Sequence, residues 1–119
     1  MRNPIVYVPQ ETMRLNRQTG EMESKFDLTP AAAFGTLKVV VNSPNTSLMT
    51  HHAVKHIRSQ LRDYTDRDYI LGTGSPATMM MVAMVAATIN DGRVKLLQWD
   101  QRAKNYIVLE VDALGRNND

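Results

Sequence analysis

The sequence predicts an α/β protein with a small, mostly parallel sheet, two main helices and a C-terminal antiparallel hairpin. Two observations support this fold class: strand-like and helix-like runs alternate from residue 36 onward, and only a short polar stretch separates the last two strand-like runs. Alternating strands and helices favour right-handed βαβ units and a parallel sheet, whereas the short connection favours a hairpin. A length of 119 residues fits a single domain.

The α/β core is expected over residues 36–112 and opens with the strand Thr36–Val41. This β-branched run ends in three valines, which is typical of a strand covered on both faces. A helix is expected over about residues 47–64, because apolar residues recur there at helical spacing while charged residues fall mostly elsewhere. These apolar residues are Val54, Ile57, Leu61 and Tyr64.

The second strand, Asp68–Leu71, leads into a glycine-rich loop and is expected to be central in the sheet. A second helix follows over residues 76–90, and Gly92 fits the left-handed position after its end. Two further strands complete the predicted sheet as a hairpin, with a polar connection over residues 100–105. Their ranges are 94–99 and 106–111.

Residues 1–35 are expected to form an N-terminal strand, an arm and a short helical turn. Ile5–Val8 alternates like a short strand that Pro9 closes. The polar stretch 10–25 is either a loose hairpin through Met13 and Leu15 or an ordered arm. The turn of helix over 31–34 would take Thr29 as its N-cap, Pro30 as its first residue and Gly35 as its stop. Residues 113–119 are expected to be a disordered tail.

Composition excludes several classes of site and partner. The chain has no cysteine, so disulfides, thiolate metal sites and a cysteine nucleophile are impossible. A formal net charge of +2 is far from the strongly basic balance of proteins that coat nucleic acid. No apolar run is long enough to span a membrane, and no apolar stretch follows the N-terminus, so we expect a cytoplasmic protein.

The strand-to-helix loop Gly72–Ala77 is the first candidate functional feature. Gly72, Thr73, Gly74 and Ser75 combine close backbone approach with a capped helix N-terminus, which suits an anion or a nucleotide. Arg58, Arg62 and Asp100 are expected near the same edge of the sheet, where they would contact a phosphate or a ribose hydroxyl. The alternative is a tight turn followed by a good helix start, with Pro76 removing one donor.

The methionine-rich helix that follows is the second candidate feature. It is apolar nearly all the way round, so its outer face needs a cover beyond the sheet. We expect another subunit to cover it and hence a homo-oligomer; burial under the N-terminal arm is the alternative. The expected interface residues are Met80, Met81, Met84, Val85 and Thr88.

No catalytic or metal site can be assigned. His52 and His56 lie four residues apart on the first helix, but no third ligand is in register, so we expect a solvated polar face and no metal. The hydroxyl residues lie in no nucleophile motif. We therefore expect no cofactor and favour a non-enzymatic protein.

Three segments together resemble a group of small tailed-bacteriophage proteins without an established activity. They are Lys25–Ala32 with Phe34-Gly35, then Asp68–Leu71 with Gly72, Gly74, Ser75, Pro76 and Ala77, then Gly92–Asp100, and the likeness extends over about residues 25–112. Members of the group tend to carry Asp where this chain has Ser75, and an acidic cap would compete with a bound phosphate. The resemblance implies a phage origin and the cytoplasm of an infected bacterium, and it adds no catalytic residue.

Together these features predict an oligomeric, non-enzymatic phage accessory protein that binds a host or phage protein. The alternative is a nucleotide- or anion-binding protein that sequesters or senses its ligand with the Gly72–Ala77 loop.

Overall fold

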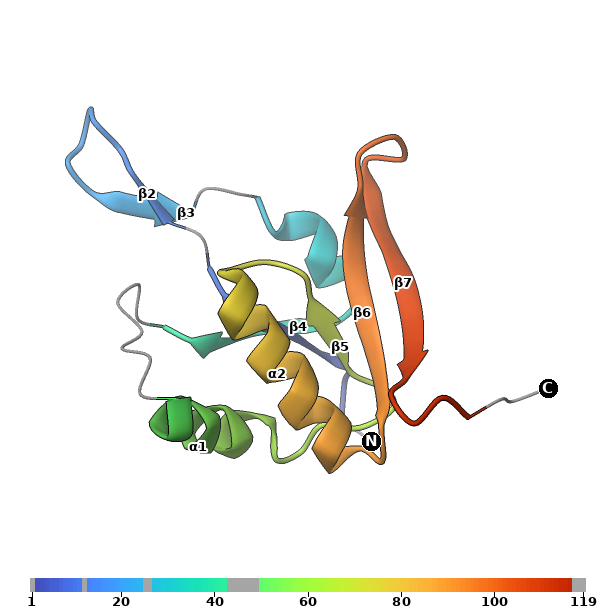
Figure 1. Ribbon diagram of the computed structural model, residues 1–119. Coiled ribbons are helices and arrows are strands. Elements are labelled where there is room, and N and C mark those ends of the chain that lie inside the picture. The colour runs from blue at the N-terminus through green and yellow to red at the C-terminus, as the bar shows by residue number, and fades with distance from the viewer. Residues whose placement is uncertain (1, 12, 25–26, 43–49, 117–119) are drawn as a thin grey trace.

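The computed structural model describes residues 2–11, 13–24, 27–42 and 50–116 and confirms the mixed α/β fold (Figure 1). Its main feature is a five-stranded sheet in the order β4-β1-β5-β6-β7, in which only β7 runs antiparallel to its neighbour. β5 is therefore central, as its sequence predicts. The strands are β1 (Ile5–Gln10), β4 (Thr36–Val41), β5 (Tyr69–Leu71), β6 (Arg93–Asp100) and β7 (Asn105–Asp112).

The first strand lies inside the sheet, between β4 and β5. It is parallel to both, with Val6 opposite Leu37 on one side and Tyr69 on the other. The expectation that Pro9 ends this strand is wrong, because β1 continues to Gln10. Pro9 is fully buried, and a strand tolerates proline where no ladder hydrogen bond is needed from that residue.

Helices α1 (Thr50–Leu61) and α2 (Pro76–Ile89) lie on one face of the sheet and pack against each other (Figure 1). The expected helix over 47–64 is confirmed for its described part; residues 43–49 lie outside the described residues. At the end of α2, Asp91 rather than Gly92 takes the position after the C-cap, and both have positive φ (+54° and +83°). The core on this face includes Tyr7, Val40, Ile57, Leu61, Tyr64, Ile70, Val82, Val85, Ala86 and Val94.

The opposite face of the sheet carries a smaller core and the 3₁₀ helix η1 (Thr29–Ala33). Its N-cap is Leu28, which makes no capping hydrogen bond through its side chain, so the expected role of Thr29 is wrong. The Asp27 carboxylate instead accepts hydrogen bonds from the Thr29 backbone amide (2.9 Å) and hydroxyl (2.5 Å). A hydrogen bond from an aspartate side chain to the amide two residues later closes an Asx-turn, and Thr29 is part of this turn.

The polar stretch after β1 forms a hairpin, which decides between the two sequence alternatives. Strands β2 (Met13–Leu15) and β3 (Met22–Ser24) pair antiparallel and project from the body of the molecule (Figure 1). At the other end of the chain, residues 113–116 are held by Arg116, which bonds to Asp91 and Asp112. Residues 117–119 of the expected tail lie outside the described residues.

Candidate functional site

The Gly72–Ala77 loop joins β5 to α2 at the carboxyl edge of the sheet, as expected. Ser75 is the N-cap of α2, and its hydroxyl accepts a hydrogen bond from the Thr78 amide (3.2 Å). Pro76 occupies the first turn and has no amide hydrogen to offer. The Thr73 amide donates to Leu71 O and the Gly72 amide to Leu97 O (2.9 and 3.0 Å).

Gly74 is required by a contact within the chain. It has a φ of +113°, and a Cβ at this position would lie 2.8 Å from the Cβ of Gln10 and 2.9 Å from its carbonyl oxygen. The Gln10 side chain also accepts the Ser75 amide hydrogen at 3.1 Å. Most donors that could cradle an anion are therefore used by the loop itself and by the end of β1.

The three polar residues expected beside this loop lie elsewhere. Arg58 stands in the last turn of α1 and Arg62 directly follows it, and both are exposed. Because α1 precedes β5 in a βαβ unit, its C-terminus feeds the amino edge of the sheet, opposite the loop. Asp100 lies three residues beyond Leu97, about 10 Å along the strand, where its carboxylate accepts the Arg102 amide in the hairpin turn (3.0 Å).

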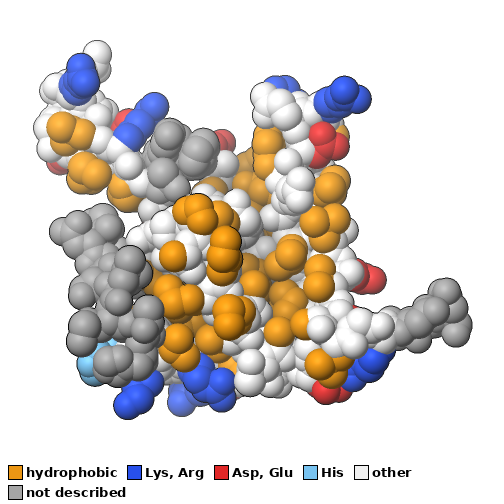
Figure 2. Space-filling model, viewed as in Figure 1, with side chains coloured by type: hydrophobic (Ala, Val, Ile, Leu, Met, Phe, Trp, Pro, Cys, Tyr) orange, Lys and Arg blue, Asp and Glu red, His pale blue; other side chains and the backbone are white. Residues whose placement is uncertain are grey.

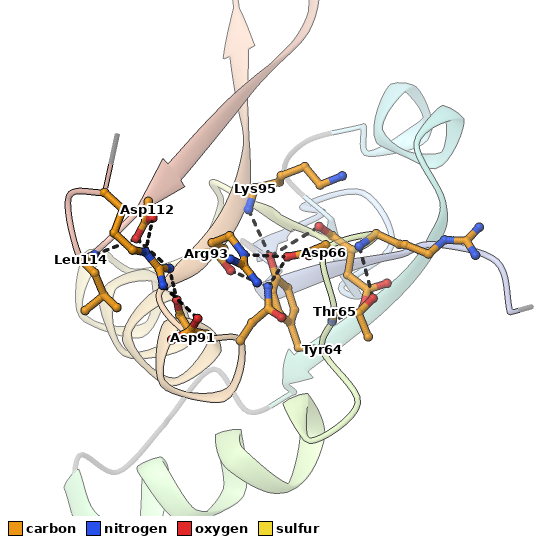
Figure 3. A network of polar contacts seen from close by, with 12 residues as sticks. Tyr64, Thr65, Asp66, Asp91, Arg93, Lys95, Asp112 and Leu114 are labelled. Atoms are coloured by element: carbon orange, nitrogen blue, oxygen red, sulfur yellow. Dashed lines mark hydrogen bonds and ion pairs between the residues drawn. The ribbon is translucent and has the colours of Figure 1, made fainter. Parts of the chain in front are cut away.

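A cleft that the sequence did not indicate lies at the amino edge of the sheet. It has a volume of about 620 Å³ and is lined by charged residues of both signs (Figure 3). Asp66 accepts a hydrogen bond from Asn90 (2.7 Å) and pairs with Arg93 (3.5 Å), which lowers its pKa. Arg116 pairs with Asp91 and Asp112. The lining includes Tyr64, Asp66, Arg93, Lys95, Glu110, Asp112 and Arg116.

Tyr64 is the only phenol that lines this cleft among the described residues, and its side chain is buried. Its hydroxyl accepts a hydrogen bond from the Lys95 amide (3.2 Å), and burial raises its pKa to about 12. The phenol therefore stays protonated near neutral pH and cannot serve as a base. The cleft is lined by three acidic and three basic side chains, of which Asp66 pairs with Arg93 and Asp112 pairs with Arg116.

The exposed face of α2 is the strongest surface feature. Met80 and Met84 are 64% and 68% exposed, and Thr88 lies beyond them on the same face. Val85 is buried and Met81 packs against the core, so these two of the five expected interface residues belong to the interior. Residues 81, 82, 85 and 86 lie on the side of α2 that packs against the core, so Met81 and Val85 point to the interior.

This apolar surface continues onto the sheet (Figure 2). Val94 and Leu96 of β6 belong to the core under α2, and they pair with Val111 and Leu109 of β7. Paired residues on antiparallel strands share a face, so the helix side of β7 is apolar and exposed. We call Met80, Met84, Ile107, Leu109 and Val111 the α2–β7 surface; their exposed fractions are 64%, 68%, 41%, 37% and 41%.

A model of the Phage Pam3 gp32-like protein family matches residues 4–113, which is most of the chain. The chain belongs to this family. The phage resemblance of its sequence is thereby confirmed. Comparison with curated proteins and with solved structures gives no match.

The gp32-like chain shows no metal cluster and no membrane span in its described part. No three His, Asp or Glu side chains there are grouped as metal ligands. His56 is exposed and its Nε2 contacts the Val40 carbonyl oxygen at 2.9 Å, while the His52 side chain is exposed on the same helix. None of the helices in the described ranges is both long and apolar enough to cross a membrane.

Proposed function

We propose that this gp32-like protein is a non-enzymatic phage accessory protein that acts by binding another protein through the α2–β7 surface. The observation that carries the proposal is that Met80 and Met84 of α2 and the helix-side residues of β7 are exposed on one face of the molecule, where Figure 2 shows apolar side chains gathered over α2 and the neighbouring hairpin. Contiguous apolar patches on a small domain mark interaction sites, whereas scattered apolar residues do not. Two exposed methionines favour this role because their side chains adapt to a partner's surface.

The architecture explains why this surface is left open. A packed helix occupies about 10 Å across a sheet and a strand about 4.8 Å, so two helices cover roughly four strands. In this fold α1 lies over the β4 side, and α2 contacts β1 and β6, between which β5 lies. On the face that carries α1 and α2, the fifth strand, β7, receives no helix among the described elements, whereas η1 contacts β7 from the opposite face. A fifth strand would need a third helix to cover it, and we propose that a partner protein covers β7 instead.

The remaining candidate sites support binding over catalysis. The loop at Gly74 uses its donors within the chain, and the cleft at Tyr64 holds mutually paired charges and a protonated phenol. General acid–base chemistry needs a group whose pKa lies near the working pH, and Tyr64 is far from it.

A comparison of two variants tests the proposal. Tagged protein is used to capture partners from lysate of infected cells, and the captured protein is identified, purified and titrated. Met84→Glu places a charge in the α2–β7 surface and should weaken binding by about tenfold or more. Arg58→Glu changes an exposed residue of α1 outside this surface and should leave affinity unchanged.

Equal affinity of wild type and Met84→Glu for the identified partner would contradict the proposal. Capture of no protein by wild type, together with a monomer in solution, would also contradict it. Circular dichroism of both variants checks that the fold is intact.

A further inference from the structure

β7 is the last strand of the sheet, and no other strand in the described part of the chain pairs with its outer edge. Only the ends of this edge are bonded within that part of the chain: the Tyr106 amide donates to the Asn105 side chain (2.8 Å), and the Gly115 amide donates to the Asp112 carbonyl (2.9 Å). All eight residues of β7 pair one to one with β6, from Asn105 opposite Asp100 to Asp112 opposite Arg93, without a bulge. The strand contains no proline, and both of its faces carry exposed apolar side chains: Ile107, Val108, Leu109 and Val111. Monomeric proteins usually protect such edges with proline, bulges, inward charges or a covering segment.

Backbone geometry shows which groups of β7 point outward. The Gly72 amide donates to the Leu97 carbonyl, so the polar backbone groups of Leu97 face β5. Val108, which is directly opposite Leu97, therefore does not exchange hydrogen bonds with β6. The amide and carbonyl of Val108 point to the free edge, and by alternation so do those of Tyr106 and Glu110.

The charges along this edge have a direction. Arg102 and Lys104 lie in the hairpin turn just before β7, and Glu110 and Asp112 lie at its end, where Asp112 also pairs with Arg116. Two copies of the strand side by side would place like charges together if parallel. If antiparallel, they would place the basic start of each strand beside the acidic end of the other.

We propose that the partner of this edge is a second copy of the chain, paired antiparallel through β7 about a two-fold axis normal to the sheet. The inference rests on the proposed function, since pairing along the β7 edge would set two copies of the α2–β7 surface side by side. Directly opposite residues share a face, and this axis preserves faces, so residues of the same parity must pair. Axes at Val108 and at Leu109 give equally long overlaps of β7, and we choose Val108 because this register sets Lys104, just before the strand, beside Asp112 of the partner subunit.

This dimer would carry a continuous ten-stranded sheet, with both α2 helices on the same side. The floor between them would be made by Ile107, Leu109 and Val111 of each copy, and the two apolar surfaces would join into one. The dimer therefore enlarges the apolar surface and does not bury it. The combined surface remains available to another protein.

Proline substitution gives a direct test. Val108→Pro removes an amide hydrogen that points to the free edge and is not used by β6, and edge strands tolerate such a proline. Native mass spectrometry should show a dimer for wild type and a monomer for Val108→Pro, with circular dichroism unchanged. Val108→Thr keeps the amide and should remain a dimer.

Cysteine cross-linking tests the register, and the chain has no cysteine of its own. Under oxidation, Val108→Cys should give a disulfide-linked dimer because this residue faces itself across the axis. Met84→Cys, on α2, should not.

The outcomes separate this inference from the proposed function. A wild-type monomer, or a Val108→Pro dimer, would overturn edge pairing whether or not Met84→Glu loses a captured partner. A dimer linked through Met84→Cys and not Val108→Cys would overturn edge pairing and favour contact through α2. A dimer linked through Val108→Cys whose captured protein binds Met84→Glu normally would keep edge pairing and overturn the proposed function.

Discussion

Arg2 and Asp68 form a two-pronged ion pair that ties the start of β1 to the start of β5. The guanidinium donates from Nη1 to Oδ1 at 2.8 Å and from Nη2 to Oδ2 at 2.6 Å. The same carboxylate accepts the amide hydrogens of Ile5 (2.9 Å) and Thr65 (2.8 Å). Asp68 is fully buried, and its side chain satisfies donors from two separate segments, residues 2–5 and Thr65.

Asp68→Ala should therefore be among the most destabilising single substitutions. It leaves two backbone amides and a half-exposed guanidinium without their acceptor, and such losses cost about 2–4 kcal/mol. Urea denaturation should show a lower midpoint with an unchanged slope. Glu23→Ala, which removes the exposed ion pair with Arg14, is the matched control and should change stability by less than about 1 kcal/mol. Equal effects of the two substitutions would contradict this role for Asp68.

Stability should also fall in acid because of Asp68. Burial alone would raise the pKa of this carboxyl, but hydrogen bonds from Arg2, Ile5 and Thr65 hold its pKa below the usual range. Its contribution is therefore present above the unfolded-state pKa, near 4, and is lost as pH falls through the lower folded-state pKa. In denaturation experiments between about pH 5 and 2, Asp68→Asn should show a flatter dependence than wild type. The same slope in both would argue against this linkage.

Alkaline pH should lower the stability of the fold through Tyr64. Burial raises its pKa to about 12, so above the unfolded-state pKa near 10 the unfolded chain releases the proton more readily than the folded one. Stability is then lost as pH rises from about 10 to 12, by about 2–3 kcal/mol for this group. Tyr64→Phe should reduce the loss, and what remains belongs to Tyr7 and Tyr106, whose pKa values burial also raises. An unchanged alkaline profile would contradict the assignment.

Two glycines of one loop should respond differently to alanine. Gly74→Ala meets both a positive φ and a backbone contact below 3 Å with Gln10, and should cost about 2 kcal/mol or more. Gly72→Ala meets only the Leu97 carbonyl oxygen at 3.4 Å, an ordinary contact, and should be milder. Thermal denaturation of the two variants compares them. If Gly74→Ala were as stable as wild type, the packing of the loop on β1 would not require glycine.

Local sequence patterns predicted the core elements because each is built from neighbouring residues. The valine run of β4, the helical spacing of Ile57 and Leu61, and the Ser75-Pro76 helix start all appear where expected. The position of β1 between β4 and β5 could not be predicted, because periodicity defines a strand but not its neighbours in a sheet.

The site predictions depended on long-range contacts and fared less well. The sequence around Gly74 is compatible with an anion-binding loop, but in the structure Gln10, which is remote in sequence, packs against Gly74 and accepts the Ser75 amide hydrogen. The placement of Arg58 and Arg62 was wrong because connectivity sets which edge of the sheet a helix end reaches. Asp68 gave one unused signal: an aspartate directly before a buried strand has to find partners, since a buried carboxylate is costly alone.

The insertion of β1 into the middle of the sheet has a kinetic consequence. Its two ladders join Val6 to Leu37 and to Tyr69, so each closes a large loop, whereas the β6–β7 and β2–β3 ladders close short turns. Ladders that close short loops form fastest, and parallel pairings between distant segments are slow. We therefore expect the two hairpins to form early in refolding. The centre of the sheet should form last, in one cooperative step in which β1 pairs with β4 and β5 together.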